Sequence, residues 1–394
     1  MAIKSILVAN RGEVAVRIIR ACRLSGVRSI AVFSEADEAA LWTRLADEAH
    51  CIGPAPAAQS YLDIGRIVAT AKEAGADAVH PGYGLLSESA DFAKAVSSAG
   101  LVSIGPSASG IARMGDKVSA RAAAVEAGVP VLPGSDGPVN DPAAALAIAG
   151  AIGWPIAVKA SFGGGGRGMR VARGPADLEQ AMAEATREAA AAFGRGEIYL
   201  ERYLDRPRHV EVQVLGDAHG HVIHLGDRDC SVQRRHQKLI EEAPAPELYD
   251  GLRERIASAA VSLARREAYR SSGTVEFLVA GEEFFFLEMN TRLQVEHGVT
   301  ELVTGIDIVC QQIRIANGEP LGIAQEDVRI SGHAIQARIA AEDAWENFRP
   351  TPARIGKLGL PTGPWLRLDF GVEAGDAIAP HYDSMFGKVQ AWGQ

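Results

Sequence analysis

The sequence is poor in cysteine and lacks any paired cysteine motif. Its four cysteines are scattered along the chain, and no Cys-x-x-Cys spacing occurs. They are Cys22, Cys51, Cys230 and Cys310. A disulfide framework or a structural zinc site requires paired or closely spaced cysteines, so the sequence excludes both. We therefore expect a protein of a reducing compartment.

Long apolar runs are also missing. The longest stretch without charge, residues 142–158, is rich in alanine and is interrupted by Gly150, Gly153 and Pro155. A helix that spans a bilayer needs about 20 strongly apolar residues, so we expect a helix, a turn and a strand here. The apolar segment at residues 6–9 is too short for a signal peptide. We expect a cytoplasmic protein that makes no use of a membrane.

Positive charge is in short supply as well. Lysine and arginine number 40 against 49 acidic residues, which gives a net charge of −9 and a pI of about 5.6. Such an acidic chain is not expected to bind nucleic acid or anionic membranes in general. At 394 residues the chain is too long for one small core, so two or three domains are expected.

Residues 4–105 alternate short apolar strands with amphipathic helices but lack a dinucleotide fingerprint. The expected strands are Ser5–Ala9, Ser29–Phe33, Ala76–His80 and Leu101–Gly105, and the expected helices are Glu13–Leu24, Ile64–Ala74 and Ala90–Ala99. This alternation predicts an α/β unit with a parallel sheet covered on both faces. Residues 10–16 carry one glycine where G-x-G-x-x-G is required, so a dehydrogenase is not expected. The P-loop and the G-x-S-x-G elbow are missing from the sequence too.

A run of four glycines follows an expected strand at Ile156–Ala160. Lys159 stands at the end of that strand, Gly163 to Gly166 form the run, and Arg167 comes next. Successive peptides without side chains let N–H groups converge on an anion, and the two cations add positive charge. The pattern indicates a phosphate-binding loop, with a flexible surface hairpin as the alternative.

Residues 273–289 are typical of a β-hairpin. If it turns about Glu282, then Glu276 stands directly opposite Glu288, and Asn290 lies on the same face. Facing carboxylates repel unless a proton or a cation lies between them. Three oxygens near a phosphate loop suit Mg²⁺. The alternative is a solvated strand face.

The alternation of side chains between two faces is expected to continue beyond the hairpin. If the chain stays extended, Arg292, Gln294 and Glu296 project with Asn290, while Leu293 and Val295 face the other way. Such a polar row suits a cleft that handles a metal, a phosphate and a small anion. The residues alone therefore indicate a nucleotide-dependent enzyme.

Two further clusters support a site. His209, Glu211 and Gln213 alternate along one strand face, and residues 228–238 are dense in cations. A solvated basic loop is the alternative for the second cluster. Cys230 within it is expected to be a packed thiol, because no histidine can be argued to activate it.

Six motifs in order resemble the biotin carboxylase family, the ATP-grasp component of biotin-dependent carboxylases. They are Asn10-Arg-Gly-Glu13, His80-Pro-Gly-Tyr-Gly84, Met114-Gly-Asp-Lys117, Gly163–Met169, Arg228–Lys238 and Glu288-Met-Asn-Thr-Arg292-Leu-Gln-Val-Glu-His297. The resemblance implies an α/β protein with an N-terminal parallel-sheet domain over residues 1–115. It implies an ATP-grasp domain over 116–325, with a mobile lid at about 131–203. A mixed, β-rich C-terminal domain would cover 332–394 and be incomplete at Gln394.

Matched positions carry the family's roles onto this chain. The ATP contacts implied are Lys117, Lys159, Gly165, Gly166, Glu201, Leu204, His209, Gln233 and His236. The metal ligands implied, for Mg²⁺ or Mn²⁺, are Glu276, Glu288 and Asn290. The bicarbonate pocket implied comprises Lys238, Arg292, Gln294, Val295 and Glu296. Arg338 matches the arginine that faces biotin.

The resemblance also implies a reaction and partners. Glu296, Arg292, Lys238 and Arg338 would be the catalytic residues that carboxylate biotin with bicarbonate through carboxyphosphate. No Met-Lys dipeptide occurs, so biotin is expected on a biotin carboxyl carrier protein or domain. A carboxyltransferase subunit would complete an acyl-CoA carboxylase of the acetyl- or propionyl-CoA type, as in fatty acid biosynthesis. A homodimer is expected if the C-terminal domain is complete.

Two other functions stay open on the sequence. Another ATP-grasp ligase would share the glycine run and the metal hairpin but not the combined pocket of Lys238, Arg292 and Glu296. A truncated, non-catalytic assembly subunit is the second alternative. Phe162 and Gly298 depart from a glycine and a proline common in the family, and both flank the expected site rather than form it.

Overall fold

The computed structural model describes residues 2–160, 169–193 and 196–394. Its N-terminal part is built on a five-stranded parallel sheet with the strand order β3-β2-β1-β4-β5. The strands are β1 (Ser5–Val8), β2 (Arg28–Phe33), β3 (Glu48–Cys51), β4 (Ala78–His80) and β5 (Val102–Ser103). The helices here are α1 (Gly12–Leu24), α2 (Leu41–Leu45), α3 (Ile64–Glu73), α4 (Ala90–Ser98) and α5 (Ala108–Gly115).

Alternate residues of β1 pack against helices on opposite faces of this sheet. Ile6 and Val8 join the cluster that contains α1, whereas Leu7 joins the cluster that contains α3 and α4. Strands buried on both faces consist mainly of apolar residues, as Ile6, Leu7 and Val8 of β1 do. The parallel sheet covered on both sides, predicted from the sequence, is therefore confirmed.

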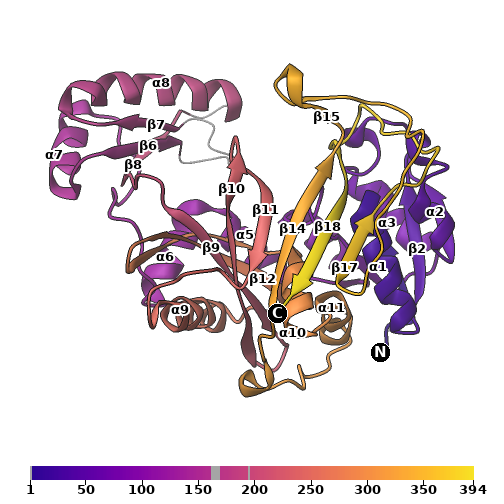
Figure 1. Cartoon of the computed structure of the whole chain (residues 1–394). Helices are drawn as coiled ribbons and strands as arrows, with labels where there is room; N and C mark the ends of the chain where they lie inside the picture. The colour runs from indigo at the N-terminus through magenta and orange to yellow at the C-terminus, as the bar shows by residue number, and fades with distance from the viewer. Residues whose placement is uncertain (1, 161–168, 194–195) are drawn as a thin grey trace.

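The next part of the chain forms a small antiparallel sheet, ordered β7-β6-β8, that carries two helices. Its elements are β6 (Ile156–Ala160), β7 (Met169–Ala172), β8 (Ile198–Arg202), α7 (Pro142–Ile152) and α8 (Pro175–Phe193). Apolar side chains of both helices pack on β6 and β8. Figure 1 shows this layer standing apart from the large sheet, at the upper left.

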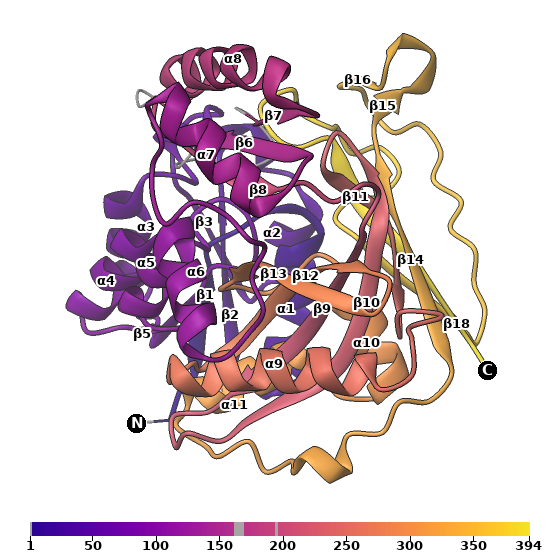
Figure 2. The same ribbon diagram turned by 90° about the vertical axis from the view of Figure 1, so that its left-hand side faces the viewer.

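The large sheet is antiparallel, with the order β13-β12-β9-β10-β11-β14-β18-β17. Its strands are β9 (Arg208–Gly216), β10 (Val222–Arg234), β11 (Gln237–Ala243), β12 (Ser271–Ala280), β13 (Glu283–Asn290), β14 (His333–Ala340), β17 (Leu366–Phe370) and β18 (Met385–Gly393). The remaining α-helices and β-strands are α6 (Lys117–Glu126), α9 (Leu252–Arg266), α10 (His297–Thr304), α11 (Ile308–Ala316), β15 (Glu342–Asp343) and β16 (Arg349–Pro350). Helices α9 and α6 pack on the β9–β12–β13 end. Figure 2 shows α9 running across these strands.

The C-terminal strands extend this same sheet. β14 pairs with β11, and β18 and β17 follow it. Residues 332–394 therefore share one sheet with the strands that carry the predicted metal and bicarbonate residues. None of the helices in the described ranges has the length and apolar composition needed to cross a membrane.

The basic segment at residues 228–238 is not a loop. It forms the end of β10, a two-residue turn and the start of β11, with Gln233 paired to Lys238. The turn residues Arg235 and His236 have φ values of 51° and 64°. Positive φ at both central residues is the geometry of a tight hairpin turn that matches the strand twist.

Candidate active site

A cavity of about 970 Å³ lies between the small sheet and the large one. It gathers the predicted site residues from separate parts of the chain. Those that line it are Lys117, Lys159, Glu201, Leu204, His209, Gln233, His236, Lys238, Glu276, Glu288, Asn290, Arg292, Gln294, Val295 and Arg338. Glu296 is fully buried beside it. Gly165 and Gly166, with most of the glycine loop, lie outside the described residues.

The hairpin β12–β13 places Glu276 opposite Glu288, as predicted. The turn residues are Gly281 and Glu282, and the register shifts by one residue between Glu276 and Phe277. Without that bulge Glu276 would pair with the neighbouring residue instead. Bulges of this kind re-aim side chains beside functional sites, and here the bulge brings the two carboxylates to one rung.

Lys238 is the charge centre of the site. Its ammonium lies 2.5 Å from Glu211, 2.8 Å from Glu276 and 2.7 Å from Glu296. These carboxylates come from β9, β12 and the segment just before α10. Burying one cation among three anions lowers the cost of removing each of them from water.

The pKa values follow from this arrangement. Burial alone would raise the pKa of Glu276 and of Glu296, but the Lys238 ammonium holds both below the ordinary carboxylate value. Burial would lower the pKa of Lys238, but Glu211, Glu276 and Glu296 together raise it well above the ordinary lysine value. All of these groups are therefore ionised at neutral pH.

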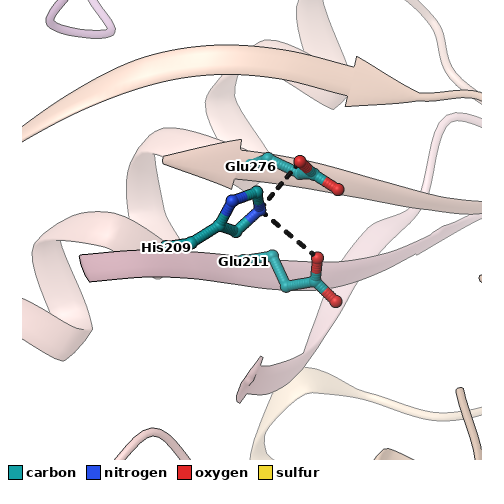
Figure 3. Close-up of side chains that lie close together, drawn as sticks. All are labelled: His209, Glu211 and Glu276. Carbon is teal, nitrogen blue, oxygen red and sulfur yellow. Dashed lines mark ion pairs between the residues drawn. The ribbon is translucent and has the colours of Figure 1, made fainter. Parts of the chain in front are cut away.

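His209, Glu211 and Glu276 form a tight group on the neighbouring strands β9 and β12 (Figure 3). The His209 Nε2 lies 2.8 Å from Glu276 and 3.9 Å from Glu211. The ligand atoms of the three residues lie within 4.8 Å of one another, as a metal site would require. Lys238 already contacts both carboxylates, so positive charge is supplied there by the protein.

Glu288 fits the predicted cation site better. Its side chain lines the cavity and is accessible from it. The pKa of Glu288 is raised above the ordinary carboxylate value, first because the surrounding protein reduces its hydration and second because the Glu276 carboxylate repels it. Asn290 donates its amide to Glu276 at 2.8 Å and accepts from Arg292 at 3.0 Å through its carbonyl oxygen. Two facing carboxylates and an amide oxygen are a hard donor set, and such oxygen donors suit Mg²⁺.

The segment after β13 departs from the extended conformation expected. β13 ends at Asn290, and α10 begins at His297. The predicted grouping of side chains is nevertheless present, because Arg292 donates to Gln294 at 3.0 Å and Gln294 donates to Glu276 at 3.3 Å. Val295 lines the cavity, although the alternation of side chains predicted that it would face away from the site.

Arg338 closes the site from β14. Its guanidinium lies 2.6 Å from Glu241 and 3.1 Å from Glu296. Glu241 lies on β11 and is fully buried. The arginine therefore neutralises two buried carboxylates while one face of it lines the cavity.

The side of the cavity that the resemblance assigns to ATP is formed by α6, β6 and β8. The Asp116 side chain accepts the N–H of Ser119 and so starts α6 at Lys117. The Lys159 ammonium lies 2.6 Å from Glu201, which also pairs with Arg121 at 3.4 Å. Burial lowers the pKa of Lys117, which faces Glu288 across the cavity.

The chain matches three family models, two of which describe biotin carboxylase domains. Residues 2–111 match the biotin carboxylase N-terminal domain, 116–324 the carbamoyl-phosphate synthase L chain ATP-binding domain, and 336–394 the biotin carboxylase C-terminal domain. A biotin carboxylase of Haemophilus influenzae is 52% identical over 392 residues, which are 99% of this chain and 87% of the relative. The chain belongs to the biotin carboxylase family.

Solved structures agree with this assignment. The chain superposes with a TM-score of 0.95 on a biotin carboxylase β-γ-ATP complex of Campylobacter jejuni, at 47% identity over 99% of this chain and 87% of that one. The biotin carboxylase domain of a 2-oxoglutarate carboxylase from Hydrogenobacter thermophilus superposes with a TM-score of 0.93 at 46% identity. The match covers 100% of this chain and 87% of that one. Like the other biotin carboxylases, the chain is an ATP-dependent ligase that carboxylates biotin.

Several residues of this biotin carboxylase site were not among the predicted ones. Glu88 pairs with Arg292 at 3.0 Å, Glu241 with Arg338, and Arg121 with Glu201. Glu211 was noted for its strand position but given no role. Each acts through a partner distant in sequence, although Glu88, Arg121 and Glu241 follow closely after the motifs that end at Gly84, Lys117 and Lys238.

Proposed function

We propose that this chain uses ATP, Mg²⁺ and bicarbonate to carboxylate biotin presented by a partner. The observation that supports this most is the meeting of Lys238, Arg292 and Glu296 beside the Glu276–Glu288 pair. A cation site, a small-anion pocket and a buried carboxylate base are what bicarbonate activation requires.

In this proposal Arg292 and Lys238 hold bicarbonate in line with the γ-phosphate, which replaces a chance encounter by a fixed geometry. Glu296 accepts the bicarbonate proton, and its lowered pKa keeps it ionised for that task. The bicarbonate oxygen attacks the phosphorus, and ADP leaves. Glu276, Glu288 and Asn290 would hold Mg²⁺, which spreads the charge on the transferring phosphoryl group.

The second stage consumes the carboxyphosphate. It breaks into CO₂ and phosphate, and the phosphate takes the proton from the ureido nitrogen of biotin. The resulting enolate attacks CO₂ to give carboxybiotin. Arg338 would stabilise the enolate, because its guanidinium lies at the cavity wall beside Glu296.

We further propose three domains, at residues 1–115, 116–325 and 332–394, with residues 131–203 as a lid over the cavity. A biotin carboxyl carrier and a carboxyltransferase would be the partners. A relative in Mycobacterium leprae, 52% identical over 98% of this chain and 65% of its own length, is an acyl-coenzyme A carboxylase alpha3 subunit, which supports an acyl-CoA acceptor. A homodimer and a cytoplasmic location stay predictions.

The test is ATP hydrolysis measured with and without bicarbonate and free biotin. Turnover should require bicarbonate, and biotin should raise it and yield carboxybiotin labelled from ¹⁴C-bicarbonate. Turnover that depends on an amine instead would favour another ATP-grasp ligase. Absence of turnover with ATP bound normally would favour an assembly subunit.

A further inference from the structure

One rung of the large sheet reaches two consecutive residues of the site. Arg338 on β14 stands directly opposite Lys388 on β18. The Arg338 guanidinium contacts the Glu296 carboxylate at 3.1 Å, and the Lys388 ammonium donates to the Val295 carbonyl oxygen at 2.7 Å. Lys388 therefore holds the peptide that joins Val295 to Glu296, and Arg338 holds the side chain of Glu296.

Lys388 is fully buried and held in place by the N-terminal part of the chain. Its ammonium lies 3.1 Å from Glu13 on α1 and 6.0 Å from the ring centre of Tyr83. The Tyr83 hydroxyl donates to the same Glu13 carboxylate. An ammonium buried with an anion and a carbonyl acceptor has few ways to move, so it is a rigid donor.

The peptide that Lys388 holds lacks the support of regular structure. Among the described residues, those from 291 to 296 belong to neither a strand nor a helix, and Glu296 is the N-cap of α10 without a side-chain capping bond. A sheet ladder or a helix would fix this carbonyl. Here a side chain from a distant strand does so.

We propose that Lys388 is a positioning residue for the bicarbonate pocket: by holding the Val295 carbonyl, it orients the Val295–Glu296 peptide and the Glu296 carboxylate. This inference rests on the proposed function. It predicts a specific defect, because displacing a reacting group by about 1 Å can cost on the order of 100-fold in rate.

The main variant is Lys388→Met, which keeps an unbranched side chain of similar length. It should raise the KM for bicarbonate roughly 10- to 100-fold, while the KM for ATP changes less than about threefold. A purely structural loss would lower the fraction of active enzyme and hence kcat, but it would leave both KM values unchanged.

A second variant removes the unpaired charge that Lys388→Met leaves on Glu13. In Glu13→Gln/Lys388→Met the ion pair is replaced as a whole, which costs less than removing one partner. The melting temperature should recover toward that of the wild type, while the bicarbonate defect persists. Glu13→Gln alone is the matched control. The glutamine oxygen can still accept a hydrogen bond from the Lys388 ammonium, so the Lys388–Val295 hydrogen bond should persist and the bicarbonate KM should stay within about threefold of wild type.

The outcomes separate the two proposals. Wild-type enzyme without bicarbonate-dependent turnover would overturn the proposed function and this inference with it. Active wild type with normal bicarbonate KM in the double variant would overturn the positioning role alone. Failure of both Lys388 variants to fold would also overturn it, because Lys388 would then serve the fold.

Discussion

The Lys238 ammonium lies 2.7 Å from the Glu296 carboxylate, and both groups are nearly or fully buried. The pair links the proposed base to the proposed anion pocket. Because Lys238 also contacts Glu211 and Glu276, it keeps three carboxylates ionised in one place. A single side chain therefore influences bicarbonate binding, the base and the neighbouring cation site.

Lys238→Gln should impair the use of bicarbonate first. Loss of a charge-assisted contact to a buried anion costs about 1.5–3 kcal/mol. That corresponds to a roughly 10- to 150-fold loss of kcat/KM for bicarbonate, at about 1.4 kcal/mol per tenfold. The ATP affinity should change far less, because Lys117 and Lys159 are untouched. The measurement is a pair of titrations, of bicarbonate and of ATP.

Arg235→Gln is the matched control for Lys238→Gln. Arg235 belongs to the same β10–β11 hairpin but is exposed to solvent. Substitution of an exposed charge typically changes free energies by no more than about 0.5 kcal/mol, so both titrations should follow the wild type. Equal shifts in bicarbonate and ATP for Lys238→Gln would contradict its place in the bicarbonate pocket.

Glu288→Gln should abolish ATP turnover and leave the fold intact. The substitution removes one of two facing carboxylates, and with it most of the charge that would attract Mg²⁺. Glu283→Gln, at the exposed start of the same strand, should keep normal turnover. Near-normal turnover of Glu288→Gln at saturating Mg²⁺ would refute the cation-site assignment.

Arg338→Gln should separate the two half-reactions. Its proposed role follows carboxyphosphate formation, so biotin carboxylation should fall at least tenfold more than bicarbonate-dependent ATP hydrolysis, about 1.4 kcal/mol of selective loss. Glutamine can still hydrogen-bond Glu241, which limits damage to the buried pair. Comparison of phosphate release with ¹⁴C-carboxybiotin formation measures the ratio, and parallel losses would assign Arg338 to folding or nucleotide binding.

Local patterns predicted the β12–β13 hairpin and much of its chemistry. Gly281 at the turn, with a φ of 61°, and the apolar alternation were visible in the sequence. The pairing of Glu276 with Glu288 was predicted correctly. The prediction assumed a hairpin without a bulge, however, whereas the observed pairing depends on one. The bulge has no signal of its own in the sequence, because a register shift depends on how the two strands pack against other elements. Phe284 and Phe286, on the turn side of the bulge, pack in the same apolar cluster as residues of α6 and α9.

The second hairpin was missed for a different reason. Its turn, Arg235–His236, contains none of the glycine or asparagine residues that normally announce a two-residue turn. The cations of this segment also suggested a solvated loop as the alternative. Arg228 is instead fully buried, because Glu211, Gln213 and Thr300 from other elements satisfy it. Pairing across strands cannot be predicted from the residues of one segment.

The last prediction concerns stability in mild acid, and it rests on His80. This histidine is fully buried, and its Nδ1 accepts the N–H of Gly82. Burial lowers its pKa from 6.5 to about 4. Between these values the unfolded chain binds a proton that the folded chain does not, so the free energy of unfolding falls as the pH decreases. The slope from His80 is about 1.4 kcal/mol per pH unit, or about 3 kcal/mol over the whole window.

His80→Asn should make the free energy of unfolding depend less on pH, by the amount that His80 contributes. Asparagine cannot be protonated, and its side-chain oxygen can still accept the N–H of Gly82. His297, which is also fully buried with a pKa lowered by burial, contributes in the same direction and stays in both proteins. The measurement is the free energy of unfolding in urea at several pH values from 6.5 down to 4.5. His221→Asn is the matched control, because its side chain is exposed in the folded chain. Parallel stability profiles for wild type and His80→Asn would show that the folded chain takes up the His80 proton as readily as the unfolded one.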